Sequence, residues 1–173
     1  MKIIIYTDGS SRGNPGPGGW ATIILTEGKE GGDDVAEFGG RETKTTNNRM
    51  ELMGAIVGLR EVGGTLAQHG VHVEVHTDSE YVKKGITEWI DGWIKKGWKT
   101  STKKDVLNKD LWQLLKGEED RLKQKEVHVA WKYVQAHVGI PLNERADTIA
   151  TACADNASDL QLYRGAKSNY TVV

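Results

Sequence analysis

Two aspartates, Asp8 and Asp78, stand where a strand-like run of residues gives way to turn residues. Because side chains from separate strands converge at strand ends in an α/β sheet, ligands commonly bind there. Two more acids, Glu51 and Asp147, each lie one turn inside a segment that reads as a helix. Four carboxylates that share one cleft repel one another unless cations neutralise them. The four acids therefore predict a site for hard metal ions.

Each of these acids also has a structural explanation that involves no metal. Asn48 and Glu51 have the spacing of a helix capping box. Asp147 lies close to the start of its helix, while Asp8 and Asp78 are residues of the type that forms turns. Taken singly, none of the acids distinguishes the two interpretations, so the metal site is predicted from the set of four.

The whole chain has the size and composition of one ordinary domain. Its 173 residues carry a formal net charge of −1 and include a single cysteine, Cys153, for which a core thiol is the simplest expectation. No leader pattern precedes the first apolar run, and no apolar run approaches the roughly 18 residues that a membrane span requires. A cytoplasmic protein without membrane contact is therefore expected, and a monomer is the simplest assembly.

The near-neutral net charge hides a basic stretch, residues 83–109, which we call the Lys/Trp segment. It contains eight lysines against three acids, together with Trp89, Trp93 and Trp98. Trp89 and Trp93 are four residues apart, as core residues of an amphipathic helix are, and some lysines are expected to form a solvated face. The concentration of charge nevertheless predicts a surface that follows nucleic-acid phosphates, so binding should weaken steeply with salt. The lysines to which we assign this role are Lys95, Lys96 and Lys99.

Periodicity and turn residues set the order of the elements. Three strands come first, followed by a helix opened by residues 46–48, a strand, helical segments, a strand and a last helix. This order predicts a mixed sheet that begins with an antiparallel meander and has helices packed on it. The periodicity disappears after Asp159, so we expect a domain over residues 1–159 and a C-terminal tail over 160–173, either ordered or flexible. The other helices are expected over 79–95, with a break near Gly85, over 106–124 and over 143–157.

Several motifs along the chain recur together, in the same order and at matching intervals, in one known family. They are Thr7-Asp8-Gly9-Ser10, Gly13-Asn14-Pro15-Gly16-Pro17-Gly18-Gly19, Thr45-Thr46-Asn47-Asn48-Arg49-Met50-Glu51-Leu52, Thr77-Asp78-Ser79, Gly85-Ile86-Thr87 with Gly97-Trp98-Lys99-Thr100, and Asn143-Glu144-Arg145-Ala146-Asp147. In these motifs the chain closely resembles bacterial type 1 ribonuclease H, which cuts the RNA strand of RNA/DNA hybrids. The resemblance implies an α/β, ribonuclease H-like fold. That fold has a five-stranded mixed sheet, antiparallel in its first three strands, flanked by helices and carrying a basic helical protrusion.

The resemblance also implies the chemistry of the site. It identifies Asp8, Glu51, Asp78 and Asp147 as the metal ligands of a two-metal endonuclease that leaves 5′-phosphate and 3′-hydroxyl ends. Mg²⁺ suits a site made of carboxylate oxygens, and Mn²⁺ is expected to substitute for it. Asp8 is the expected bridge between the two ions because its strand is central. His137 matches a mobile-loop histidine that moves protons near neutral pH; a surface histidine without function is the alternative.

The RNA strand is expected to be recognised by asparagines. Asn14 lies in the glycine-rich stretch after Asp8, which lacks the ending of a phosphate-binding loop and is otherwise read as a hairpin turn. Asn47 and Asn48 resemble residues that contact both strands across the minor groove. Because the 2′-hydroxyl both donates and accepts hydrogen bonds, asparagines can select RNA by its sugar with little sequence preference.

The DNA strand is expected to contact a second set of residues. By resemblance, Thr46, Asn108 and Trp112 form a pocket for a DNA phosphate, and Trp89 touches the DNA strand. Glu80 departs from the family because close relatives carry glutamine there. This extra potential anion beside Asp78 is expected to weaken substrate contact or to alter metal binding.

Two other functions remain open from the sequence. A transposase or resolvase of the same broad fold would act on DNA, but such enzymes generally lack the Lys/Trp segment together with the His137 loop. A non-catalytic module would bind hybrids without cutting them, and the presence of all four acids argues against it. An endonuclease specific for RNA in hybrids is therefore the preferred interpretation.

Overall fold

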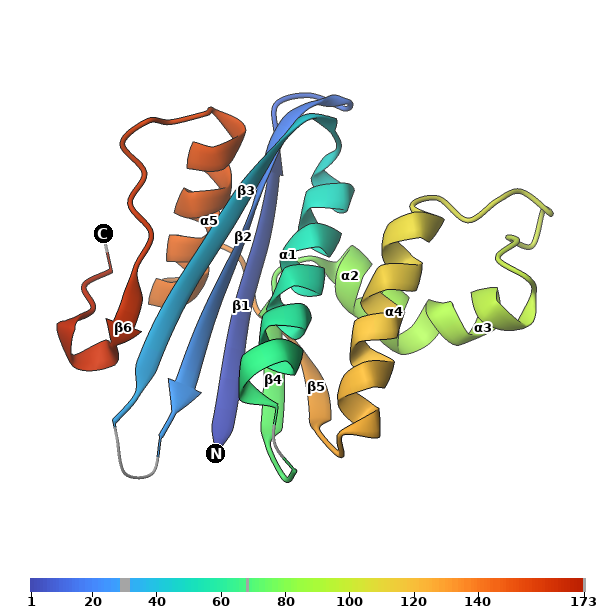
Figure 1. Cartoon of the computed structure of the whole chain (residues 1–173). Coiled ribbons are helices and arrows are strands. Elements are labelled where there is room, and N and C mark those ends of the chain that lie inside the picture. Colours follow the sequence, from blue (N-terminus) through green and yellow to red (C-terminus); the bar gives the residue numbers. More distant parts are fainter. Residues whose placement is uncertain (29–31, 68, 173) are drawn as a thin grey trace.

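The computed structural model describes residues 1–28, 32–67 and 69–172 and places them around one sheet (Figure 1). The strands follow the order β5-β4-β1-β2-β3-β6 across the sheet. Strands β1, β2 and β3 form the expected antiparallel meander, β4 runs parallel to β1, and β5 runs parallel to β4. The predicted α/β fold class is confirmed. The strands are β1 (Lys2–Ser11), β2 (Gly16–Glu27), β3 (Asp34–Thr45), β4 (His72–Thr77), β5 (His128–Tyr133) and β6 (Arg164–Ala166).

The sheet has six strands instead of the five expected. The additional strand, β6, comes from the C-terminal tail and pairs antiparallel with the edge strand β3. Periodicity does not reveal it because a strand of three residues is too short to show alternation. Val173, the last residue of the tail, lies outside the described residues.

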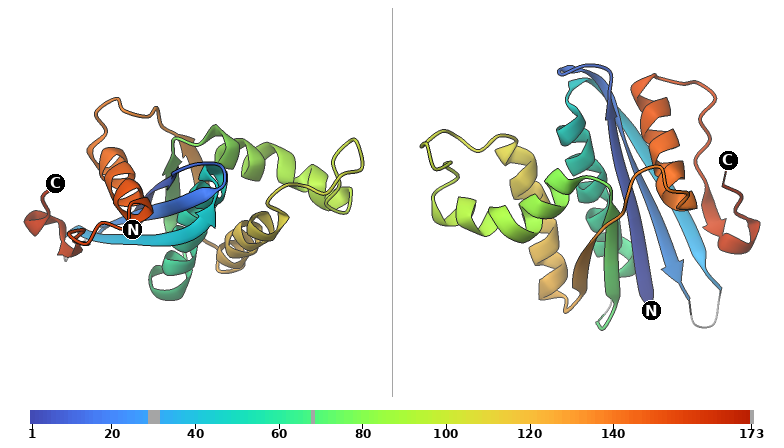
Figure 2. Two further views of the ribbon diagram at one scale, coloured as in Figure 1. Left: turned by 90° about the horizontal axis from the view of Figure 1, so that it is seen from above. Right: turned by 180° about the vertical axis from the view of Figure 1, so that it is seen from behind.

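Helices cover both faces of the sheet (Figure 2). Helices α1 and α4 pack on one face, and α5 packs on the other. Three short helical segments, α2, η2 and α3, extend beside the sheet as the expected protrusion (Figure 1). Of the helices that the structure describes, none is long and apolar enough to cross a membrane. The helices are α1 (Asn47–Glu61), the π-helix η1 (Val62–Leu66), α2 (Glu80–Lys84), the π-helix η2 (Gly85–Trp89), α3 (Ile90–Lys95), α4 (Lys109–Gln124), α5 (Pro141–Ala154) and the 3-10 helix η3 (Lys167–Asn169).

Alternating burial along β1 separates the core into two parts. Ile3 and Ile5 are fully buried in the cluster that includes α1 and α4, whereas Ile4 and Tyr6 pack against the cluster that includes α5. Successive side chains of a strand point to opposite faces, so a central strand covered on both sides requires apolar residues at every position. Asp8 continues the series of Ile4 and Tyr6, which directs it toward the face covered by α5.

The protrusion and α4 are shaped by two local features. The expected break near Gly85 is present as the π-helix η2, and a side chain at Gly85 would collide with the ring of Trp112. The helix expected over residues 106–124 begins instead at Lys109. Asn108 has a φ of 60°, a left-handed conformation that does not continue into a right-handed helix.

Candidate metal centre and substrate surface

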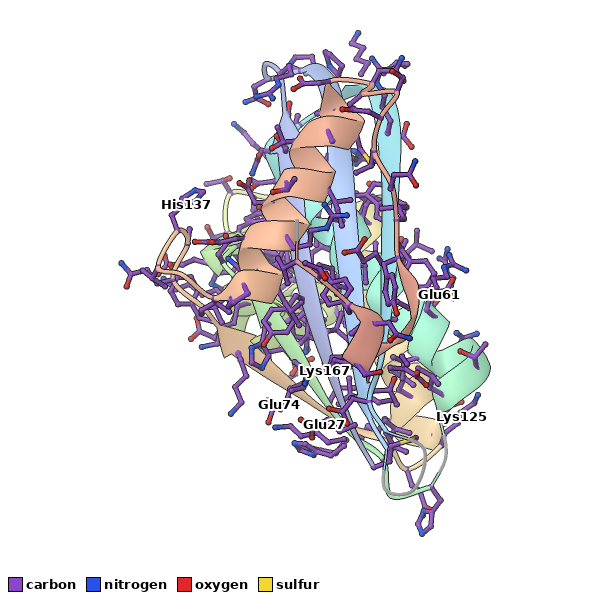
Figure 3. All side chains as sticks on the ribbon, turned by 90° about the vertical axis from the view of Figure 1, so that its left-hand side faces the viewer. Glu27, Glu61, Glu74, Lys125, His137 and Lys167 are labelled. Carbon is purple, nitrogen blue, oxygen red and sulfur yellow. The ribbon has the colours of Figure 1, made fainter. Side chains whose placement is uncertain are left out.

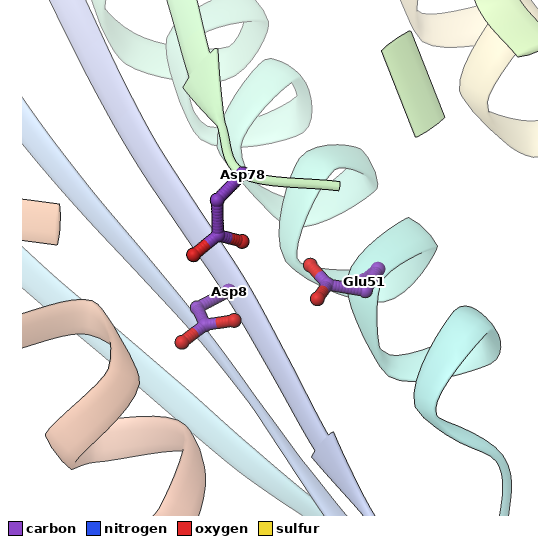
Figure 4. Close-up of side chains that lie close together, drawn as sticks. All are labelled: Asp8, Glu51 and Asp78. Carbon is purple, nitrogen blue, oxygen red and sulfur yellow. The ribbon is translucent and has the colours of Figure 1, made fainter. Parts of the chain in front are cut away.

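The pairing between β1 and β4 places the first two acids side by side. Thr7 and Thr77 are partners in this parallel pair, and an aspartate follows each of them. β4 ends at Thr77, so Asp78 begins the turn while Asp8 still belongs to β1. Figure 4 shows that the side chains of Asp8 and Asp78 converge with that of Glu51. The expected cluster of acids is therefore formed, although β1 continues past Asp8 to Ser11 instead of ending there.

Glu51 reaches this cluster from helix α1. The helix begins after Thr46, whose side-chain oxygen accepts a hydrogen bond from the backbone N–H of Arg49 at 3.3 Å. The cap is thus Thr46 and not Asn48, which removes the capping-box explanation for Glu51. A side chain at Gly9 would collide with the backbone of Glu51, so glycine lets α1 approach β1 closely.

The three carboxylates form a compact group in which Asp8 and Glu51 are buried and Asp78 is half-buried. Asp8, Glu51 and Asp78 each contribute one oxygen to a set of atoms that lie within 4.8 Å of one another. Asp8 and Glu51 are each only 5% exposed, and Glu51 Oε2 has no hydrogen-bond partner among the described residues. A buried carboxylate oxygen without a donor is costly, so the group favours protons or cations. The all-oxygen donor set fits a hard cation such as Mg²⁺.

Burial and mutual repulsion raise the pKa values of these acids. Loss of hydration, followed by the charge of Asp78, raises the pKa of Asp8 to about 8. Burial and the charge of Asp8 raise the pKa of Glu51 well above its ordinary value. Burial is also the largest cause of the raised pKa of Asp78. Since metal ligands must be deprotonated, a cation that binds here displaces protons.

The fourth acid, Asp147, approaches the group from α5. Its charge contributes to the raised pKa values of both Asp8 and Asp78. Within the part of the chain that the structure describes, its oxygens do not join the set that lies within 4.8 Å. Asn143, one helical turn earlier, donates a hydrogen bond from Nδ2 to Asp78 Oδ2 at 3.4 Å. Sequence reasoning missed Asn143, although its spacing from Asp147 places the two on one helix face.

His137 lies in the exposed loop between β5 and α5, where it projects outward (Figure 3). Its backbone is left-handed, with a φ of 54°. The charge of His137 opposes the rise in the pKa of Asp78, which places it within electrostatic range of the acids. The loop is tied to α5 because the backbone N–H of Gly139 donates to Glu144 Oε1 at 3.1 Å.

A shallow hollow of about 470 Å³ brings together five of the residues expected to contact substrate. It lies between the turn after β1, the start of α1 and the residues before α4. Four of the eight residues that line it carry side-chain amides, which can both donate and accept hydrogen bonds. The predicted residues that line it are Asn14, Thr46, Asn47, Asn48 and Asn108.

Two residues that sequence reasoning missed hold Asn108 in place. Asn108 donates from Nδ2 to the hydroxyl of Tyr81 at 3.0 Å, and its Oδ1 accepts from Arg49 Nη1 at 3.3 Å. Arg49 also forms two hydrogen bonds with the carboxylate of Asp110, at 2.9 and 2.8 Å. Arg49 follows Asn48 directly in one of the motifs shared with the family, and this is the signal that could have identified it.

Trp112, predicted to help form the pocket for a DNA phosphate, lies beneath the surface of the protein. Trp112 is 0% exposed and belongs to the hydrophobic core. Its indole N–H donates to the hydroxyl of Tyr81 at 3.1 Å, so the donor is already used. The physical reason is packing: the Trp112 ring fills the space left by Gly85, and it supports the surface from beneath.

The Lys/Trp segment combines a buried and an exposed part. Trp93 and Trp98 are half-buried, with ring centroids 6.3 Å apart, whereas Trp89 is 38% exposed. Lys95 and Lys96 are exposed at the end of α3. The other predicted lysine, Lys99, forms an ion pair with Asp105, and Glu80 forms one with Lys84 at 3.4 Å.

Comparisons with known proteins agree on one family. The sequence profile of the RNase H family matches residues 1–155. The ribonuclease H of Marinobacter nauticus is 50% identical over 149 residues, which are 86% of this chain and 91% of the relative. The ribonuclease H of Phenylobacterium zucineum is 46% identical over 165 residues, or 95% of this chain and 98% of the relative.

Solved structures share the fold. LC9-RNase H1, a type 1 RNase H, is 28% identical with a TM-score of 0.72, and the match covers 95% of this chain and 77% of that one. LC11-RNase H1, solved in complex with an RNA/DNA hybrid, is 25% identical with a TM-score of 0.66 over 90% of this chain and 98% of that one. With its acidic cluster at the expected strand ends, this chain belongs to the RNase H family.

Proposed function

We propose that this chain hydrolyses the RNA strand of RNA/DNA hybrids in a reaction that depends on two Mg²⁺ ions. The observation that carries the proposal is the compact group of Asp8, Glu51 and Asp78 in a member of the RNase H family; within the described parts of the chain, Glu51 Oε2 has no hydrogen-bond partner. These three acids hold the ions, and Asp147 completes the set from α5. Asp8, on the central strand, would help to hold both ions.

Bound Mg²⁺, or Mn²⁺ in its place, supplies activation of the attacking water and stabilisation of the leaving 3′-oxygen. The acids of the chain contribute by ionising, because their raised pKa values make proton loss and cation binding mutually dependent. Asn143 holds Asp78 in orientation through its side-chain amide. The products are a 5′-phosphate and a 3′-hydroxyl.

His137 moves a proton near the attacking water or the departing product. Its exposed position on a loop allows exchange with solvent, and an imidazole can both accept and donate a proton. The hydrogen bond between Gly139 and Glu144 limits how far the loop departs from α5.

The substrate lies across the amide-lined hollow and the Lys/Trp segment. Asn14, Asn47 and Asn48 read ribose hydroxyls, so selection is by sugar and sequence preference is low. Thr46 and Asn108 face a DNA phosphate. The basic surface follows the DNA strand, which makes affinity dependent on salt. The residues of this basic surface are Trp89, Trp93, Lys95, Lys96, Trp98 and Lys99.

Glu80 adds a negative charge at the edge of the substrate surface. Its side chain is 64% exposed and its ion pair with Lys84 is a surface pair, so the charge is only partly offset. We expect Glu80 to weaken contact with the hybrid.

All of the proposed catalytic residues lie within the catalytic domain, residues 1–159, and the enzyme acts as a cytoplasmic monomer.

Cleavage assays with three labelled substrates test this function. An RNA/DNA hybrid, a DNA duplex and an RNA duplex are each incubated with Mg²⁺ and with a chelator. Cutting of only the RNA strand of the hybrid, and only with Mg²⁺, supports the proposal. Cutting of the DNA duplex would indicate a transposase-like enzyme, and hybrid binding without cutting would indicate a non-catalytic module.

A further inference from the structure

The C-terminal tail meets a buried carboxylate on the strand next to it. Glu37 of β3 is 0% exposed, and four hydrogen bonds end on its two oxygens. Arg145 donates from Nε at 2.8 Å and from Nη2 at 3.0 Å. The backbone N–H of Tyr163 donates at 2.9 Å, and the hydroxyl of Tyr170 donates at 2.7 Å. Two of these four donors therefore belong to the tail.

Further contacts hold the tail along the edge of the sheet. The backbone N–H of Glu37 donates to the carbonyl of Tyr163 at 2.8 Å, next to the β3–β6 pairing. The rings of Tyr163 and Tyr170 lie 5.0 Å apart, and both pack against the cluster that includes α5. Lys167 also forms an ion pair with Asp33 at 3.1 Å, but this pair lies at the surface and adds little to the hold on the tail. Figure 3 shows the tail running beside α5, with Lys167 labelled.

Arg145 connects this edge to the helix that serves the metal centre. It lies on α5 between Asn143, which contacts Asp78, and Asp147. Arg145 Nη2 also donates to the backbone carbonyl of Gln161 at 2.8 Å, so the tail contacts the guanidinium directly. The Arg145 side chain is only 10% exposed, so these partners replace the water that would otherwise stabilise its charge.

We propose that the tail, residues 160–172, positions α5 and thereby sets the geometry of Asn143 and Asp147 at the metal centre. Glu37 and Arg145 are positioning residues: they contact each other and the tail, and both transmit the placement of the tail to the helix. This role deepens the proposed function and rests on it. It assigns a function to a segment that begins after residue 155, where the match to the family profile ends.

The physical basis is the shared ion pair. Without the tail, Glu37 loses the donors from Tyr163 and Tyr170, Arg145 loses the carbonyl of Gln161, and water gains access to the pair. A buried ion pair is held in one geometry only while its remaining hydrogen-bonding groups are satisfied. Helix α5 then gains freedom to shift relative to β3, and groups that support metal ligands are sensitive to small displacements.

Three variants separate positioning from simple stabilisation. A chain ending at Asp159 removes the tail, Tyr170→Phe removes one hydrogen bond to Glu37, and Lys167→Ala removes an exposed tail contact as the matched control. For each we measure kcat and KM on an RNA/DNA hybrid, the Mg²⁺ concentration for half-maximal activity, and Mn²⁺ affinity by calorimetry without substrate. Near-UV circular dichroism identifies the temperature at which each variant is fully folded.

The truncated chain is expected to lose about 10-fold or more in kcat and in Mn²⁺ affinity, with an unchanged KM. Tyr170→Phe should shift both quantities in the same direction by less, and Lys167→Ala should match the wild type. If the truncated chain does not fold, Tyr170→Phe decides. Folded variants with wild-type kcat and Mn²⁺ affinity would overturn the proposal. If the wild type does not cut hybrids, the proposed function is wrong, and the Mn²⁺ affinities of the variants still test the role of the tail.

Discussion

The carboxylate of Glu37 and the carboxylate of Asp8 are both buried, yet their pKa values move in opposite directions. Burial alone raises both. At Glu37 the hydrogen bonds from Arg145, Tyr170 and Tyr163 outweigh burial and lower the pKa. At Asp8 the neighbours are other acids, so the pKa rises further. The number of donors, more than the depth of burial, distinguishes a carboxylate that stabilises the fold from one that awaits a cation.

Replacement of Asp8 should affect activity far more than it affects the fold. Asp8→Asn keeps the shape of the side chain but removes a negative charge from the donor set. We expect cleavage of the RNA strand to fall by about 1000-fold or more. The reason is that the metal ions, which offset the negative charge of the transition state, lose one of their ligands. Single-turnover cleavage at saturating Mg²⁺ measures this loss. A variant that keeps a tenth of the wild-type rate would place the metal elsewhere.

Replacement of Glu37 should have the reverse profile, with stability as the main loss. Glu37→Ala leaves the nearly buried charge of Arg145 without its carboxylate. The free energy of unfolding should decrease by about 3 kcal/mol, as measured by urea denaturation. Asp33→Ala, which removes the exposed ion pair with Lys167, is the control and should cost less than about 1 kcal/mol. Equal decreases in the free energy of unfolding would mean that the buried ion pair of Glu37 stabilises the fold no more than the exposed pair of Asp33 does.

These two sites also differ in how far the sequence predicts them. Asp8, Asp78 and Glu51 could be predicted because each aspartate follows an apolar, strand-like run and Glu51 lies one turn inside a helix with clear periodicity. Glu37 carries no such mark: its donors come from α5 and from a tail without periodicity, so only the fold brings them together. The full burial of Trp112 could not be predicted for a related reason, since a tryptophan at a substrate surface and one beneath it look alike in sequence.

His137 tests whether a residue outside the buried cluster contributes less than the cluster itself. His137→Ala removes the proton-transferring group but leaves the acids untouched. Turnover should fall by about 100-fold, a smaller loss than for Asp8→Asn. The kcat of both variants on the same hybrid gives the comparison. Small and equal losses would refute the division of roles between metal ligands and proton carrier.

The opposite pKa shifts predict opposite effects of pH on the metal-free protein. In the folded protein Asp8 has a pKa of about 8, so it stays protonated at pH values where the same carboxyl group in the unfolded chain, with a pKa of about 4, has already ionised. The free energy of unfolding in chelator should therefore fall as pH rises between these values, by up to about 1.4 kcal/mol per unit, and Asp8→Asn should flatten this slope. The lowered pKa of Glu37 acts in acid instead, where its stabilisation is lost as pH falls below about 4.

The most direct test of the metal centre is calorimetric titration of Mn²⁺ into the substrate-free protein at pH 7. Use of two buffers with different ionisation heats measures both binding and proton release. Mn²⁺ should bind the wild type with release of protons from the buried acids, and Asp8→Asn should show neither effect. Equal Mn²⁺ binding by the two proteins, or binding without proton release, would contradict the assignment of Asp8, Glu51 and Asp78 as the metal site.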